Sequence, residues 1–315
     1  LVVEAVFEDQ AIKADVTKKA EAAMPPGGVF ASNTSTLPIT GLAKASSRPP
    51  QFVGIHFFSP VERMPLVEII RGKETSEETI ARAVDYVTQL RKTPIVVNDS
   101  RGFYTSRVFG TFTNEGMTLL GEGVKPALIE NAAKFAGMPV GPLAVLDEVT
   151  LELAWHVTQQ TALALGKDYQ PLSGFPVLQK MVEGLKRLGK RQGAGFYDYP
   201  ADAKKRLSPV LAEHFPQAAE QPDVEAVKQR LLYIQALETA RCLEEGVLND
   251  PVDGDLGSIL GWGFPAWTGG TLSFIDTVGI QTFVSECERL AAAHGPRFQP
   301  SAWLKARAAR GEGFY

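Results

Sequence analysis

Two residues able to do acid–base chemistry stand at matching places in two apolar segments. His56 lies near the end of the apolar segment 52–57, and twelve residues later Glu68 interrupts the aliphatic segment 66–70. A carboxylate among aliphatic side chains is costly unless a partner compensates it, and an imidazole on a neighbouring strand is such a partner. A carboxylate that orients an imidazole favours a general base, which takes the proton of a secondary alcohol while a hydride leaves the same carbon. Taken alone, His56 is more typical of a hydrogen-bonded core histidine; Glu68 and the strand-end location together favour catalysis.

A second polar cluster, residues 32–36, follows the short apolar segment 29–31. Its hydroxyl and amide groups suit hydrogen bonds to a substrate oxygen or to a ribose, and they suit an ordinary helix N-cap equally well. In open α/β sheets, ligands bind at the carboxyl ends of strands. Both clusters therefore follow predicted strands at the kind of place where a ligand binds.

The elements that must position these residues alternate between strand and helix over residues 1–99, which predicts βαβ units and a largely parallel sheet. The segments beginning at Phe52 and Leu66 have no helix between them, so we expect them to form an antiparallel edge. Residues 1–6 form a β-branched run typical of a buried parallel strand, so we expect an incomplete domain without its glycine-rich phosphate loop. We predict strands over 1–6, 29–31, 52–57, 66–70 and 95–97, and helices over 10–24 and 75–90, the latter with a Thr75–Glu78 capping box.

From residue 102 onward the pattern is mostly helical, with helices expected over 107–120, 126–135, 152–165 and 177–188. Four landmarks then recur in the same order, with offsets of 118 to 129. This recurrence predicts two copies of one helical unit, over about 101–199 and 222–315, which share core architecture without a second active site. The landmarks are Glu122-Gly123-Val124 and Glu245-Gly246-Val247, Gly137-Met138-Pro139 and Gly263-Phe264-Pro265, Leu146-Asp147 and Ile275-Asp276, and Gly195-Phe196-Tyr197 and Gly313-Phe314-Tyr315.

The predicted fold class is thus α/β plus all-α: an incomplete Rossmann-type domain over 1–99, a helical unit over 100–200, a linker over 201–221 and a second helical unit over 222–315. Hydrophobic residues make up 44% of the chain, which is enough for two or three cores. The net charge of -4 argues against nucleic-acid binding. No apolar run approaches the roughly 18 residues of a transmembrane segment.

The remaining residues with metal or redox chemistry are sparse. Cys242 and Cys287 form no disulfide framework and lack metal-ligand spacing, as do the other histidines, so no metal site is expected. Two isolated cysteines are typical of a reducing compartment, and we expect a cytoplasmic protein.

Several of these motifs resemble the 3-hydroxyacyl-CoA dehydrogenase family. The resemblance covers essentially the whole chain and implies oxidation of a (3S)-3-hydroxyacyl-CoA with NAD as the cofactor. The motifs that carry it are Val3-Glu4-Ala5-Val6-Phe7-Glu8, Ala31-Ser32-Asn33-Thr34-Ser35, His56-Phe57-Phe58-Ser59-Pro60, Leu66-Val67-Glu68-Ile69-Ile70, Gly102-Phe103 and Gly195-Phe196-Tyr197.

The resemblance also implies roles for single residues. His56 would be the general base, Glu68 its orienting partner, and Ser35 a hydrogen-bond partner of the reacting oxygen close to the nicotinamide. Ser106 stands at a catalytic position where the family often has Asn, and Ser59 likewise replaces a common Asn. The positions that match cofactor contacts of the family are those of Glu8, Lys13, Ser35, Ser59 and Arg191.

The Gly-Phe-Tyr-Thr-Ser-Arg segment at 102–107 and the second helical copy resemble the dehydrogenase part of multifunctional fatty-acid oxidation α-subunits. This implies a hydratase/isomerase domain before residue 1 and a thiolase subunit as partner. Because the first βαβ unit, whose helix N-terminus would bind pyrophosphate, is expected to be missing, we also expect little NAD binding or activity in these 315 residues alone. Two alternatives stay open. One is an NAD-dependent dehydrogenase of a short hydroxy acid or sugar acid, and the other is a non-catalytic assembly module of a multienzyme complex.

Overall fold

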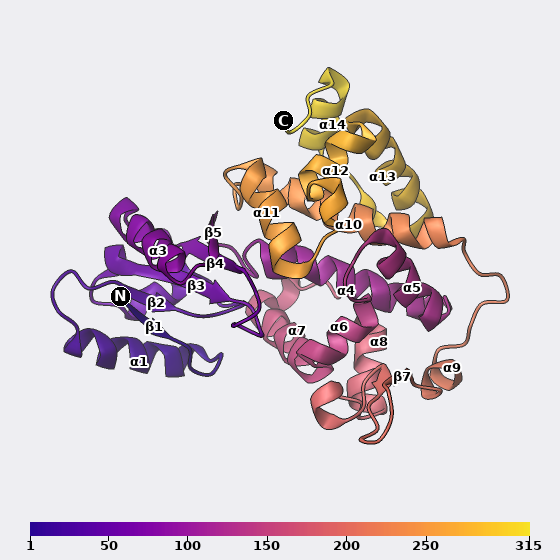
Figure 1. Cartoon of the computed structure of the whole chain (residues 1–315), viewed down its shortest axis with the longest axis horizontal. Coiled ribbons are helices and arrows are strands. Elements are labelled where there is room, and N and C mark those ends of the chain that lie inside the picture. Colours follow the sequence, from indigo (N-terminus) through magenta and orange to yellow (C-terminus); the bar gives the residue numbers. More distant parts are fainter. The chain divides into compact units, whose positions relative to one another are not determined.

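The computed structural model describes all 315 residues, which divide into two compact units (Figure 1). The first unit contains the sheet and most of the C-terminal helices. It is built from Leu1–Val108, Ala236–Ala293 and Gln299–Tyr315. The second unit is mainly helical and consists of Phe109–Gln235 with His294–Phe298. Two long helices, α4 (Thr105–Gly121) and α10 (Val224–Glu244), each contribute residues to both units.

The first unit is organised around a five-stranded mixed sheet with the order β1-β2-β3-β4-β5. The pairs β1–β2, β2–β3 and β4–β5 are parallel, and β3–β4 is antiparallel. The antiparallel pairing was expected, but the expectation of a sheet edge there is wrong, because β5 pairs with β4 on its outer side. The strands are β1 (Val2–Glu4), β2 (Phe30–Ser32), β3 (Phe52–Phe57), β4 (Leu66–Arg71) and β5 (Thr93–Asn98).

Both faces of this sheet are buried, because successive side chains along a strand point to opposite faces. One face packs Val53, Ile55 and Ile69 with helix α3 (Glu77–Gln89). The opposite face packs Phe52 and Ile70 with residues of α1 (Gln10–Ala23), α2 (Ile39–Leu42) and the C-terminal helices. Figure 1 shows α3 and α1 on opposite sides of the strands. The edge strand β1 is more open, and the Val2 side chain is 39% exposed.

Helices α10 to α14 follow in the C-terminal part, of which Ala236–Ala293 and Gln299–Tyr315 belong to the first unit. Val97 of β5 forms an isolated antiparallel bridge with Leu248. A Cβ added at Gly257 of α11 would lie 2.7 Å from the Tyr104 ring, so α11 approaches the start of α4 too closely for any larger residue. These helices are α11 (Pro251–Trp262), α12 (Thr271–Val278), α13 (Ile280–His294) and α14 (Ala302–Arg310).

The second unit holds the helices between α4 and α10. The segment 201–221, expected as a linker, carries strand β7 and helix α9, and Ala218 donates its amide to the carbonyl of Gly123. The elements are α5 (Pro126–Ala136), α6 (Pro142–Val149), α7 (Leu151–Leu165), α8 (Phe175–Gln179), β6 (Tyr197–Asp198), β7 (Arg206–Leu207) and α9 (Val210–His214). None of the helices in the chain combines the length and the apolar composition needed to cross a bilayer.

Two local predictions differ from the structure. The capping residue of α3 is Ser76, whose hydroxyl accepts the amide of Thr79, whereas the Thr75 hydroxyl donates to the carbonyl of Phe52. The helix expected over 177–188 ends earlier, since α8 runs into a π-helical turn over Lys180–Gly184 and Lys186 then adopts a positive φ of 54°.

Candidate active site

His56 and Glu68 face each other across the antiparallel β3–β4 pair. The two residues are direct partners in the strand register, and His56 Nδ1 lies 2.9 Å from Glu68 Oε2. The Glu68 side chain is fully buried, and His56 as a whole is 4% exposed. The structure therefore brings together the pair that the sequence analysis singled out, in a setting that shields their interaction from water.

Glu68 is held by the first turn of α4 as well as by His56. Its Oε1 accepts the amides of Tyr104 at 3.0 Å and Thr105 at 3.1 Å, and its Oε2 accepts the Thr105 hydroxyl at 2.6 Å. Backbone amides at a helix N-terminus favour a negative charge. This explains how a carboxylate tolerates complete burial.

The turn before α4 directs those amides toward Glu68. Gly102 and Phe103 both have positive φ, 75° and 50°. Glycine adopts this region freely, but a residue such as Phe103 does so only when its surroundings hold it there. The Phe103 ring is fully buried and lies 6.2 Å from the His56 ring, centroid to centroid. The sequence analysis did not identify Thr105; a helix start next to a buried acid was the pattern that could have revealed it.

The second ring nitrogen of His56, Nε2, makes no hydrogen bond within the protein. This nitrogen is not completely buried, although His56 as a whole is only 4% exposed. The ring is flanked by Phe58, whose centroid lies 4.5 Å away.

Three of the predicted site residues, Glu8, Lys13 and Ser35, lie near the carboxyl ends of β1 and β2 and contact polar neighbours there. Glu8 Oε1 accepts the Thr34 hydroxyl at 2.6 Å and the amide of Ser35 at 3.1 Å. The Ser35 side chain itself is exposed. Lys13 is 1% exposed, and its Nζ donates to Glu4 Oε1 and to the carbonyl of Asn33, each at 3.0 Å. Lys13 thus holds the ends of β1 and β2 together from inside the unit.

Asn33 connects this loop to the strand that carries His56, because its Oδ1 accepts the amide of Phe57 at 3.2 Å. Ser59 is exposed and Ser106 half-buried, and neither hydroxyl has a partner within the protein. Seven of the eight predicted site residues therefore belong to the first unit. Arg191 is exposed in the second unit, and its contact with a cofactor stays a prediction.

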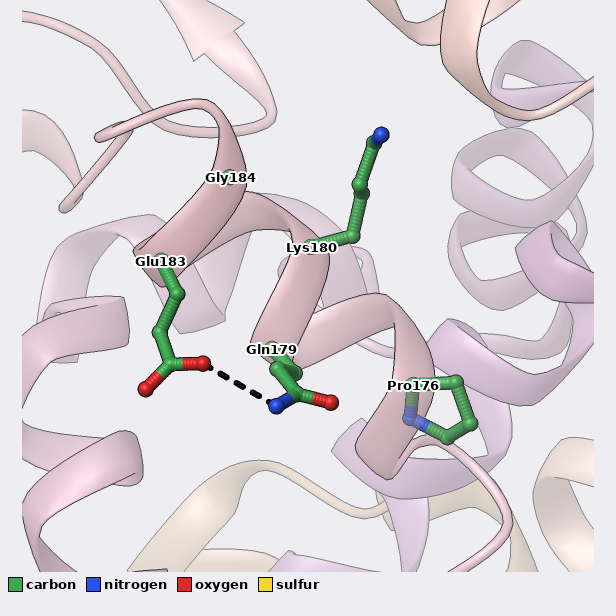
Figure 2. A pocket seen from close by; sticks show the side chains of 5 residues that line it. All are labelled: Pro176, Gln179, Lys180, Glu183 and Gly184. Atoms are coloured by element: carbon green, nitrogen blue, oxygen red, sulfur yellow. Dashed lines mark hydrogen bonds between the residues drawn. The ribbon is translucent and has the colours of Figure 1, made fainter.

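One cavity lies away from these residues, in the second unit. It has a volume of about 420 Å3 and is shown in Figure 2. Gln179 donates to Glu183 at 3.0 Å along one wall, while the Lys180 side chain points away from that pair. No histidine lines the cavity, so it lacks the acid–base pair found in the first unit. Its lining residues are Pro176, Gln179, Lys180, Glu183 and Gly184.

Comparison with known proteins identifies the family. Residues 1–100 match the NAD binding domain of 3-hydroxyacyl-CoA dehydrogenase, and residues 102–199 match its C-terminal domain. The chain belongs to the 3-hydroxyacyl-CoA dehydrogenase family, with a Rossmann-like NAD-binding domain followed by a helical C-terminal domain. NAD is the cofactor of that domain.

Individual relatives agree with this assignment. The fatty acid oxidation complex subunit alpha of Shewanella sp. (strain ANA-3) is 40% identical over 321 residues, which cover the whole chain and 45% of that protein. The chain thus spans less than half the length of this relative. The crystal structure of (S)-3-hydroxybutyryl-CoA dehydrogenase from Ralstonia eutropha is 36% identical, with a TM-score of 0.58 over 63% of this chain and 70% of that one.

A further solved structure has the same fold over nearly the whole chain. The 3-hydroxybutyryl-CoA dehydrogenase of Escherichia coli K12 is 24% identical, with a TM-score of 0.81 over 98% of this chain and 81% of that one. This likeness shows the fold of both units' elements and nothing finer.

Proposed function

We propose that the chain is the dehydrogenase part of an enzyme that oxidises (3S)-3-hydroxyacyl-CoA to 3-oxoacyl-CoA in fatty-acid β-oxidation. The observation that carries the proposal is the buried His56–Glu68 pair, in which one imidazole nitrogen faces the carboxylate and the other makes no hydrogen bond. The stereochemistry rests on family resemblance, including the (S)-specific relative from Ralstonia eutropha. The thioester substrate likewise comes from the family.

His56 would handle the proton of the reaction. Every donor around Glu68 points at its two oxygens, so Glu68 serves as an acceptor and the His56 Nδ1 carries hydrogen toward it. The tautomer that results leaves the Nε2 lone pair free to accept the proton of the 3-hydroxyl group. When the imidazole becomes protonated, the Glu68 carboxylate stabilises its positive charge. In the reverse direction, Nε2 would return the proton to the 3-oxo oxygen.

The polar groups beside this pair fit a nicotinamide cofactor. The Glu8 side chain is 27% exposed, and the hydroxyls of Ser35 and Ser59 are exposed without a partner in the protein. Carboxylate and hydroxyl groups of this kind are suited to hold ribose and amide groups by hydrogen bonds. NAD, when bound, supplies the acceptor for the hydride that leaves the substrate carbon. Lys13 would act from behind, since its ammonium fixes the strand ends that present Glu8 and Ser35.

We also propose that the helical region consists of two copies, over about 101–199 and 222–315. Both contain an aspartate that accepts the amides of a Gly-Phe-Tyr segment: Asp147 with Phe196 and Tyr197, and Asp276 with Phe314 and Tyr315. In both, an Arg donates to the carbonyl of the glycine of that segment, Arg187 in one and Arg307 in the other. Recurrence of the contacts as well as the residue types supports a duplication.

The wider setting follows from the relatives and is likewise a proposal. The Shewanella protein is a subunit of a fatty acid oxidation complex and is more than twice as long as this chain. We propose that this chain works within a comparable multifunctional enzyme, with a hydratase/isomerase domain and a thiolase subunit as partner. Cys242 and Cys287 are both buried and unpaired, which is consistent with a reducing, cytoplasmic compartment.

The experiment that tests the function uses the complete gene product, with 3-hydroxyacyl-CoA, the matching free acids and NAD. We expect turnover of the thioester and not of the free acids, and a loss of kcat by about a hundredfold to ten-thousandfold in His56→Ala. The matched control is His156→Ala, because His156 is exposed on α7 and makes no hydrogen bond. Turnover of free acids alone would indicate a hydroxy-acid dehydrogenase. Intact assembly without any wild-type turnover would indicate an assembly module, and full activity of His56→Ala would show that the site is assigned wrongly.

A further inference from the structure

Thr105 contacts the same oxygen of Glu68 that His56 contacts. The Thr105 hydroxyl lies 2.6 Å from Glu68 Oε2, and His56 Nδ1 lies 2.9 Å from that atom. Thr105 is 1% exposed, so no water competes for the contact. A hydroxyl has one hydrogen to donate, and here a carboxylate oxygen that carries no hydrogen is its partner.

The contact serves Glu68 rather than the helix on which Thr105 lies. Threonine near a helix start often accepts an amide of its own first turn. The Thr105 hydroxyl instead donates to Glu68 on strand β4. Its neighbour Ser106, at the position where the family often has Asn, makes no hydrogen bond within the protein. The residue that links this turn to the His56–Glu68 pair is therefore Thr105.

With Thr105 in place, Glu68 receives four donors, two on each oxygen: the amides of Tyr104 and Thr105 on Oε1, and the Thr105 hydroxyl and His56 Nδ1 on Oε2. A carboxylate has about four lone-pair sites, so its acceptor capacity is filled. Rotation of the carboxylate, or transfer of a proton to Oε2, would break one of these bonds. Without the hydroxyl, Oε2 would keep a single donor and a free, buried lone pair.

We propose that Thr105 is a positioning residue of the dehydrogenase: its hydroxyl fixes the Glu68 carboxylate so that His56 is held as the Nδ1–H tautomer with Nε2 free. The tautomer matters because only a free Nε2 can take the substrate proton. Thr105 does not touch the reacting atoms and acts through Glu68. This inference rests on the proposed function and adds a residue to that site.

The anchor of this turn lies in the C-terminal helices. The Tyr104 hydroxyl donates to the carbonyl of Gly254 on α11 at 2.7 Å, and its ring packs edge-on against Trp262 at 5.5 Å. Tyr104 is fully buried. The start of α4 is thereby held by α11 as well as by Glu68, which fixes the position of the Thr105 hydroxyl.

The test compares Thr105→Val with Thr105→Ser in the complete gene product. Valine has nearly the shape of threonine without the hydroxyl, so we expect kcat for the 3-hydroxyacyl thioester to fall about tenfold with KM changed less than twofold. Thr105→Ser keeps the hydroxyl and is expected to recover most of kcat. The control is Thr113→Val on the same helix, where a buried hydroxyl donates only to the carbonyl of Gly110, and wild-type kcat is expected.

A measurement without turnover gives a second readout. Nitrogen-15 spectra of the histidine rings, assigned with His56→Gln, are expected to show the Nδ1–H tautomer in the wild type and a mixture in Thr105→Val. Wild-type kcat together with wild-type His56 ring shifts in a folded Thr105→Val protein would overturn the role of Thr105. If the wild type itself does not oxidise the thioester, the proposed function fails, and the role of Thr105 fails with it. If the wild type is active and Thr105→Val is equally active, Thr105 alone is wrongly assigned.

Discussion

The two proposed helical copies share one set of contacts but use it in different surroundings. In the region 101–199, Tyr197 donates its hydroxyl to Glu130 at 2.7 Å, and Glu130 accepts the amide of Leu143 at the start of α6 at 2.8 Å. In the region 222–315, Tyr315 donates to Asp255 at 2.8 Å. Asp255 in turn accepts the amide of Leu272 at the start of α12 at 2.7 Å. Each copy thus uses a carboxylate and a tyrosine to tie its last segment to the start of a helix.

The copies differ in what their equivalent helices bury. Helix α13 buries an apolar stripe that includes Ile280, Phe283 and Leu290. Helix α7, at the equivalent place in the first copy, buries only Leu151, and Leu163 is 75% exposed. The second copy also packs glycines of α11 against the sheet and Tyr104. The two regions therefore share a set of contacts, and the region 222–315 is the one that packs against the sheet carrying His56 and Glu68.

Neither copy contains a second His–Glu pair of the kind formed by His56 and Glu68. The shared carboxylates accept backbone amides and tyrosine hydroxyls within each copy. Common core architecture without a second active site stays a prediction. The recurring contacts thus hold the helical segments together, whereas the positions of His56 and Glu68 depend on the first turn of α4.

The largest expected effect comes from adding a methyl group at the glycine of each Gly-Phe-Tyr segment. A Cβ at Gly195 would lie 1.8 Å from Asp147 Oδ1, whereas a Cβ at Gly313 would lie 2.9 Å from Asp276 Oδ1. Overpacking usually costs about 1–3 kcal/mol. The overlap at Gly195 cannot be relieved without breaking the hydrogen bonds that the backbone amides of Phe196 and Tyr197 donate to Asp147. We expect Gly195→Ala to lower the free energy of unfolding by about 3 kcal/mol or more, and Gly313→Ala by about 1 kcal/mol, in denaturant titrations.

The control for this pair is Gly193→Ser, since a Cβ at Gly193 meets nothing within 4 Å but its φ is 80°. It measures the backbone cost without any overlap, which is about 1 kcal/mol. An equal decrease in the free energy of unfolding for Gly195→Ala and Gly313→Ala would contradict the closer approach of Asp147 to Gly195 than of Asp276 to Gly313.

An intermediate effect is expected from the ionisation of Asp147. Burial raises the pKa of Asp147 from 3.8 to about 6, although the amides of Tyr197 and Phe196 and the Tyr199 hydroxyl oppose the shift. Because the folded protein binds this proton more tightly than the unfolded chain, the contribution of Asp147 to stability is complete below about pH 4. It is lost as the pH rises through about 6, and the loss is at most about 3 kcal/mol.

The measurement is the free energy of unfolding of wild type and Asp147→Asn from pH 4 to pH 7. Asparagine does not ionise, so we expect the wild-type advantage over the variant to shrink as the pH rises through this window. Asp202→Asn removes an exposed charge that makes no hydrogen bond, and serves as the reference for charge alone. A wild-type advantage that stays constant or grows with pH would contradict the raised pKa.

The sequence predicted the central features of the site because they follow from short-range patterns. The spacing of His56 and Glu68 in two adjacent apolar strands fixes their register once the strands are antiparallel. The recurrence of Gly-Phe-Tyr in the same order as three other landmarks indicated the two copies, and the structure supplied the contacts of Asp147 and Asp276 that support them.

Other features depend on the backbone path, which residue patterns do not contain. We predicted that the helix after Gly102 begins at Arg107, but α4 begins at Thr105. The difference of two residues matters, because it decides whether the Thr105 amide and hydroxyl donate to Glu68. The direction of the Thr105 amide and hydroxyl follows from the positive φ of Phe103, a conformation that residue propensities do not predict for phenylalanine. Lys13 was matched to cofactor contacts, yet its burial depends on Glu4 and Asn33, which lie far apart in the sequence.

The smallest expected effect concerns the residue that precedes α7 and α13 in the two copies. Thr150 has a φ of 72°, and Gly279, at the equivalent place, has a φ of 87°. A β-branched residue is strained in this region, but the Thr150 hydroxyl partly compensates by accepting the amide of Leu153 at 3.2 Å.

Thr150→Gly relieves the strain and loses this cap and some unfolded-state stiffness, so we expect a net stabilisation of about 0.5 kcal/mol. Gly279→Thr, which adds strain to the copy that already has glycine, is expected to destabilise by about 1–2 kcal/mol. Both free energies of unfolding are measured by chemical denaturation. A loss of stability in Thr150→Gly would show that the hydrogen bond from Leu153 to the Thr150 hydroxyl outweighs the backbone strain.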